Sequence, residues 1–119
     1  MTRPARPLAE VAADVFAGQA TPEELHRTFL VSTLWCQALE RPGFVAVEVD
    51  GAMLIPVFTS PEQLARAYGA VAWFSTSGKD LYELVPEGYD LVLDPAGDTP
   101  LCLHMAAVRK VARPIVGWG

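Results

Sequence analysis

Two cysteines and two histidines are the side chains of this chain best suited to catalysis. Cys102 and His104 are two residues apart, so on a strand both side chains would lie on one face. Together with Cys36 from a neighbouring strand, they would form a thiolate–imidazole site or a three-ligand metal site. However, neither cysteine lies next to a lysine or a helix start that would activate its thiol. We therefore expect both thiols to be reduced and buried, and all three residues to serve packing.

The remaining ionisable residues do not form a recognisable reactive group either. Calcium loops place acids at alternating positions around a glycine, whereas Asp90, Asp94 and Asp98 are four residues apart. We expect these acids to solvate the surface, and we expect His26, which lies among charged residues, to be exposed. The chain also lacks the motifs of phosphate-binding loops, serine hydrolases, zinc proteases and dithiol enzymes. We predict no catalytic residue, no metal site and no cofactor.

Three hydroxyl side chains stand where a helix is expected to begin, at Thr21, Ser60 and Ser77. A hydroxyl at a helix start can act as a nucleophile or help to bind an anion. Neither a base with an orienting partner nor a row of small residues accompanies Thr59 and Ser60. Proline follows both Thr21 and Ser60, and proline suits the first turn of a helix. We predict that Thr21, Ser60 and Ser77 are structural helix caps.

Large aromatic side chains are the best candidates for binding, because they bury much area with few torsions to freeze. We predict a contact surface that includes Trp73, Phe74, Tyr82 and Trp118. Trp73 and Phe74 are adjacent, so on a strand they would point to opposite faces and one would be less buried. Trp118 lies next to the end of the chain and is expected to dock on its own domain, to dock on a second copy, or to stay loose. Trp35 is expected in the core.

Apolar spacing and turn residues divide the chain into short alternating helices and strands. After Thr28 the residues become β-branched and aromatic, which favours a strand over the alternative of a continuing helix. Helices are expected at residues 8–17, 21–28, 60–68 and 77–85 and in a short stretch after Val108, and strands at 31–37, 44–49, 52–58, 71–74, 89–93 and 100–105.

The pair Asp50-Gly51 is the strongest hairpin signal in the chain, because both central residues of a tight hairpin turn have positive φ. The returning segment Ala52–Phe58 is apolar on both faces. We therefore expect it to be a central strand in a sheet that is covered on both sides, or on one side and by a partner molecule on the other. Pro56 cannot donate a ladder hydrogen bond and marks an edge or a bulge near the end of this strand.

Length and composition predict one α+β domain with a mixed sheet of five or six strands and three or four short helices. A chain of 119 residues has room for one core, and 51% hydrophobic with 19% charged residues excludes a disordered chain. We divide it into a flexible segment 1–7, a domain 8–107 and a tail 108–119 that docks. The net charge of −5 argues against nucleic-acid binding, and the apolar runs are too short to span a membrane. A cytoplasmic location is expected.

Two segments resemble the N-terminal domain of the SseB (enhanced serine sensitivity) family. The first is residues 54–64, where a strand runs through Phe58-Thr59-Ser60 into a helix. The second is residues 88–97, a strand followed by a turn in which Asp94 replaces the usual Asn and Ala96 delays the glycine by one position. The resemblance covers residues 21–105. It implies a small mixed α/β domain, cytoplasmic and of unsettled role, with no catalytic residues to transfer.

Taken together, the residues predict a non-catalytic protein-interaction or regulatory domain that associates with itself or with another protein. The expected contact surface is the exposed part of the sheet together with the tail from Val108 to Trp118. Two alternatives remain open: a domain that binds a small amino-acid-like molecule between sheet and helices, and an enzyme that uses Cys102 and His104.

Overall fold

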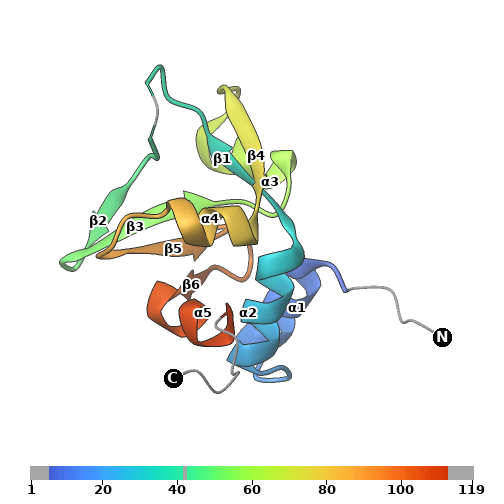
Figure 1. Cartoon of the computed structure of the whole chain (residues 1–119). Coiled ribbons are helices and arrows are strands. Elements are labelled where there is room, and N and C mark those ends of the chain that lie inside the picture. The colour runs from blue at the N-terminus through green and yellow to red at the C-terminus, as the bar shows by residue number, and fades with distance from the viewer. Residues whose placement is uncertain (1–5, 42, 113–119) are drawn as a thin grey trace.

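The computed structural model describes residues 6–41 and 43–112, and over these residues the chain forms an α+β domain with six strands and five helices (Figure 1). The α+β class is as predicted. The helices number five: four in the body of the domain, and the short one expected after Val108, which begins earlier, at Met105. The elements in chain order are α1 (Leu8–Phe16), α2 (Pro22–Val31), β1 (Thr33–Gln37), β2 (Val47–Val49), β3 (Ala52–Val57), α3 (Pro61–Tyr68), β4 (Trp73–Ser77), α4 (Gly78–Leu84), β5 (Tyr89–Leu93), β6 (Leu101–Leu103) and α5 (Met105–Ala112).

The six strands are divided between two sheets where the sequence suggested one. Four of them form a mixed sheet in the order β2-β3-β5-β6, in which only β3 and β5 run parallel. The other two, β1 and β4, pair antiparallel. A single bridge joins the sheets, because Trp35 and Phe58 exchange two backbone hydrogen bonds of 2.9 Å.

Pro56 gives a physical reason for this division. Backbone N–H groups two residues apart on a strand point the same way, so Pro56 faces the same edge of β3 as Leu54 and Phe58. Leu54 pairs with β2 on that edge, and Phe58 bonds to β1. Pro56 lies between them and has no N–H to donate. The ladder is therefore interrupted there, and β1 and β2 meet β3 at separate places.

The predicted hairpin and the central position of its second strand are confirmed. Asp50 and Gly51 have φ of 51° and 84°, the left-handed conformation that this turn requires. β3 lies between β2 and β5. Both of its faces are buried, since Leu54 on one face and Ile55 on the other are almost inaccessible.

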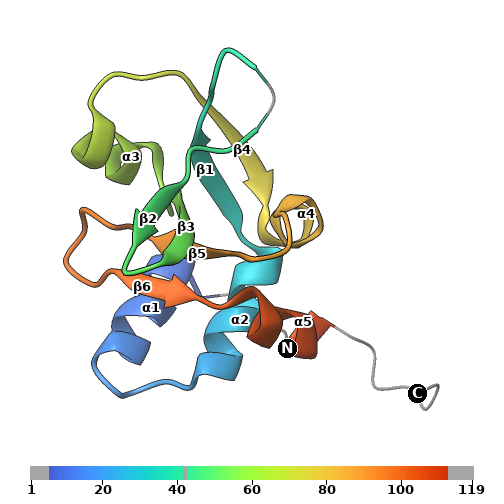
Figure 2. The same ribbon diagram turned by 90° about the vertical axis from the view of Figure 1, so that its left-hand side faces the viewer.

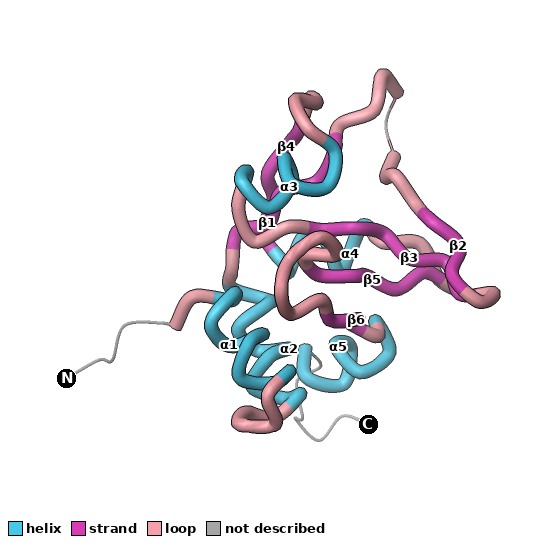
Figure 3. The backbone as a smooth tube through the Cα atoms, turned by 180° about the vertical axis from the view of Figure 1, so that it is seen from behind, coloured by secondary structure: helices cyan, strands magenta, loops and turns pink. Residues whose placement is uncertain are grey.

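Helices α1, α2 and α5 together cover one face of the four-stranded sheet, as Figures 1 and 3 show from opposite sides. Their apolar side chains form one core with the sheet, which includes Phe29, Ile55, Leu91, Leu103 and Val108. Val108 is fully buried, so the folded part of the chain extends beyond the boundary predicted at residue 107. No helix among the described residues has the length and apolar character needed to cross a membrane.

The helices begin where the capping residues predict. The hydroxyl oxygens of Thr21, Ser60 and Ser77 each accept a hydrogen bond of 3.1–3.2 Å from the backbone N–H three residues further on. At the C-terminal end of α2 the helix continues past Thr28 to Val31 before β1 starts, because Phe29 is drawn into the core. A residue of β5 caps the start of α5: Asp90 Oδ1 accepts a hydrogen bond of 2.8 Å from the backbone N–H of Met105.

Candidate functional site

The structure separates the two cysteines. Cys36 lies on β1 and is buried, whereas Cys102 lies on β6 and is exposed, so the expectation that both thiols are buried is wrong for Cys102. Burial raises the pKa of Cys36 to about 12, which keeps it a neutral thiol. Among the described residues, no group of three His, Cys, Asp or Glu side chains is arranged to hold a metal ion.

His104 is oriented by a carboxylate and not by a thiol. Its Nδ1 lies 3.3 Å from Asp90 Oδ2, while the other oxygen of Asp90 holds the first turn of α5. Cys102 is exposed on the same side of β6 as His104. Within the described part of the chain, no hydrogen bond connects the thiol to the imidazole. The pair therefore lacks the contact through which a base activates a nucleophile.

His26 is buried, with only 7% of its surface accessible, so its predicted exposure is wrong. It lies between Leu25 and Phe29 on the face of α2 that packs into the core. Desolvation lowers the pKa of His26; Glu23 opposes this effect, and His104 adds to it. The charged residues around His26 suggested an exposed position. The helical spacing of Leu25 and Phe29 was the better guide, because His26 lies with them on the buried face of α2.

Asp94 is also buried, at 8%, which corrects the expectation that all the acids in this region are solvated. Its carboxylate accepts two hydrogen bonds from Thr59, one from the backbone N–H at 2.8 Å and one from the hydroxyl at 2.7 Å. The Asp94 N–H donates to the Val57 carbonyl at 2.9 Å. Residues 35 positions apart are thus joined at the ends of two parallel strands, where sequence analysis expected only a helix cap. We assign Asp94 a structural role, because both of its carboxylate oxygens accept hydrogen bonds from Thr59.

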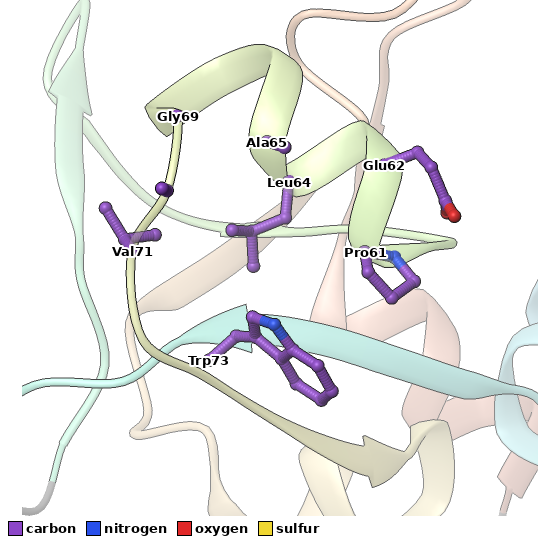
Figure 4. Close-up of a pocket in the computed structure, with 8 residues that line it drawn as sticks. Pro61, Glu62, Leu64, Ala65, Gly69, Val71 and Trp73 are labelled. Atoms are coloured by element: carbon purple, nitrogen blue, oxygen red, sulfur yellow. The ribbon is translucent and has the colours of Figure 1, made fainter.

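Trp73 lines an apolar groove between α3 and β4, and 49% of its surface is accessible. The groove has a volume of about 560 Å³ and includes Pro61, Leu64 and Val71. Figure 4 shows the indole lying beneath α3, with Leu64 and Pro61 above it. Glu62 is the one ionisable side chain on its wall.

Phe74 lies on the other face of β4, as predicted, and lines a second apolar groove of about 540 Å³. Its ring contacts that of Phe44, with the centroids 6.1 Å apart, and Leu39 and Leu84 add exposed apolar surface. β4 therefore has a groove beside each face.

A third predicted binding residue, Tyr82, lines neither of these grooves. Tyr82 is half-buried and packs against the core from α4. Trp118 lies outside the described residues. Trp73 and Phe74, which the sequence suggested as candidate binding residues, each line a groove, whereas the residues that complete the grooves come together only in the fold.

Comparison with known proteins gives one match. The chain fits the family model described as the SseB protein N-terminal domain over residues 8–110. No curated protein and no solved structure matches the chain. The two segments that resembled this family, at residues 54–64 and 88–97, are those that the bonds between Thr59 and Asp94 join. The chain belongs to the SseB N-terminal domain family.

Proposed function

We propose that this domain is a non-catalytic protein-interaction domain that associates with itself, and that its contact surface is the two-stranded sheet β1–β4 with the groove beside each face. The observation that carries the proposal is the half-exposed indole of Trp73 in an apolar groove. Leaving this much aromatic area in water is unfavourable, and such residues dominate the binding energy of interfaces.

The chemistry of the ionisable residues supports a role without catalysis. Cys36 is a buried neutral thiol, and the imidazole of His104 contacts a carboxylate rather than Cys102. The carboxylate of Asp94 is fully used in holding Thr59. Each group that sequence analysis considered for catalysis has a structural partner or lies apart from the others.

The proposed surface differs from the one that the sequence suggested. Val108, the first residue of the predicted docking tail, is in the core, and Trp118 lies outside the described residues. The proposal therefore depends on Trp73 and Phe74 and not on the tail.

Light scattering over a range of protein concentrations tests the proposal. We expect wild-type protein to associate, and Trp73→Ala to weaken the association about 10-fold or more, the effect of removing a central aromatic contact. Phe16→Ala is the matched control, because Phe16 is 56% exposed but lies on α1, away from both grooves. A wild-type protein that stays monomeric into the high micromolar range would contradict the proposed self-association.

A small-molecule binding domain is the second candidate, because both grooves have volumes in the range of ligand pockets, roughly 300–1,000 Å³. Specific ligands need convergent polar groups, and the grooves offer mainly Glu62 on one side and Glu40 with Arg41 on the other. A thermal-shift screen with amino acids, serine included, separates the two. A shift that one ligand alone produces, and that Trp73→Ala abolishes, would favour this candidate.

A further inference from the structure

Among the strands that the structure describes, none lies beside the outer edge of β4. The Ala38 N–H donates to the Ala72 carbonyl at 2.8 Å, and the Gly78 N–H donates to the Ser32 carbonyl at 3.0 Å. Because alternate residues of an antiparallel strand point to opposite edges, Trp73 and Ser75 direct their N–H and C=O groups away from β1. Over the described ranges, no backbone hydrogen bond reaches these groups, and Figure 2 shows β4 at the border of the two-stranded sheet.

This edge lacks three of the features by which proteins protect edge strands from pairing. Such strands are usually short or carry charges or proline. β2, at one border of the four-stranded sheet, has Glu48 at its centre and Asp50 directly after it. β6, at the other border, is only three residues long. β4 has five residues, Trp-Phe-Ser-Thr-Ser, and none is charged or proline.

The absence of charge indicates what pairs with this edge. The chain carries a net charge of −5, so two copies repel each other on average. β4 has no charged residue, so pairing of two copies along it brings no like charges of the strand itself together. The chain itself supplies a strand of matching length and character, namely β4 of a second copy.

We propose that β4 pairs antiparallel with β4 of a second copy about a twofold axis through Ser75, so that β1 and β4 of both copies form one continuous four-stranded sheet. The inference rests on the proposed interaction function and specifies its partner and its geometry. An interface of this kind is self-complementary, as twofold symmetry requires.

The side chains fit this register. Trp73 lies opposite Ser77 of the second copy, and the small serine leaves space for the indole. Phe74 lies opposite Thr76 of the second copy, which makes an aromatic–β-branched pair of the kind that stabilises sheets. Because the strand edge runs between the two grooves, the second copy covers apolar surface on both faces of β4.

Disulfide cross-linking at the axis tests the pairing. Directly opposite residues that exchange backbone hydrogen bonds have Cα atoms about 5.5 Å apart, within the range that a disulfide spans. We would introduce Ser75→Cys together with Cys102→Ser, which removes the exposed native thiol. The matched control is Glu48→Cys with Cys102→Ser, because Glu48 is an exposed residue at the centre of another border strand. The second variant is Ser75→Pro, which removes the backbone N–H that residue 75 directs away from β1. Its association is measured by light scattering.

We expect Ser75→Cys to form a covalent dimer on mild oxidation in dilute solution, Glu48→Cys to stay monomeric, and Ser75→Pro to lose the association. If wild-type protein associates but Ser75→Cys does not cross-link, the β4 pairing is overturned while the interaction function stands. If wild-type protein is monomeric at every concentration, the pairing and the proposed self-association both fail.

Discussion

At the scale of single residues, the bonds between Asp94 and Thr59 join parts of the chain that are 35 residues apart. The carboxylate is buried and accepts from both the N–H and the hydroxyl of Thr59. Asp94 also has φ of 47°, a conformation that Asn and Asp tolerate better than other side chains. An Asn at this position would keep the turn and most of the bonding.

We predict that Asp94→Ala lowers the free energy of unfolding by about 2–4 kcal/mol, because it leaves two donors of Thr59 without an acceptor and strains the turn. Asp94→Asn is the matched control and should cost less than about 1.5 kcal/mol, since its carbonyl still accepts from the Thr59 N–H. Urea unfolding measures both. Equal losses in the two variants would show that the hydrogen bonds are not the source of the stability.

His26 should make the stability of the domain depend on pH. Burial lowers the pKa of His26 below its ordinary value of 6.5, so the unfolded chain binds the proton more readily than the folded one. The stabilisation is present above pH 6.5 and is lost as the pH falls through the lower pKa of the folded state. We predict that His26→Leu flattens this part of the curve of unfolding free energy against pH. The same slope in wild type and variant would contradict the assignment.

At this scale, the role of a residue is predictable from sequence where the residue acts on its close neighbours. The caps at Thr21, Ser60 and Ser77 bond only three residues along the chain, so local pattern was sufficient. The bond from Asp94 to Thr59 spans 35 residues and depends on the parallel pairing of β3 with β5. A local sequence pattern does not show that β3 pairs with β5. The burial of Asp94, which follows from this pairing, was therefore not predicted.

At the scale of elements, Gly78 determines how closely α4 approaches α2. A β carbon at this position would lie 1.8 Å from the carbonyl oxygen of Phe29, inside the backbone of α2. The Gly78 N–H also donates to Ser32, the residue after that helix. The end of β4 and the start of α4 are thus placed against α2 by a residue without a side chain.

We predict that Gly78→Ala destabilises the domain by about 3 kcal/mol or more, because the clash is with backbone that cannot rotate away. Lys79→Ala is the control, since Lys79 is exposed one residue further along the same helix. Thermal unfolding followed by circular dichroism measures both changes. A Gly78→Ala protein as stable as the control would contradict the close packing of α2 and α4.

The elements themselves were largely predictable, whereas their assembly into sheets was not. Asp50-Gly51 predicted the hairpin and its turn, and the apolar faces of residues 52–58 predicted a central strand. The strand expected at 71–74 lies at Trp73–Ser77, because pairing with β1 fixes its ends. The division into two sheets follows from Pro56 and the bridge between Trp35 and Phe58, which are long-range features.

At the scale of the whole molecule, the two ends of the domain differ in structure: one is covered by helices, and the other is a projecting two-stranded sheet. Helices α1, α2 and α5 close one face of the four-stranded sheet, and the two-stranded sheet β1–β4 projects on the other side with an uncharged border (Figure 1). The apolar grooves lie beside that border and not among α1, α2 and α5. This asymmetry is why we place the contact surface on β4.

The central claim is that two copies associate through this uncharged edge, and sedimentation equilibrium of the wild-type protein at low and high salt tests it most directly. Screening weakens the repulsion between two chains of net charge −5, so the account predicts a monomer–dimer equilibrium whose dissociation constant stays the same or falls as salt is added. A protein that remains monomeric, or a dimer whose dissociation constant rises steeply with salt, would contradict it.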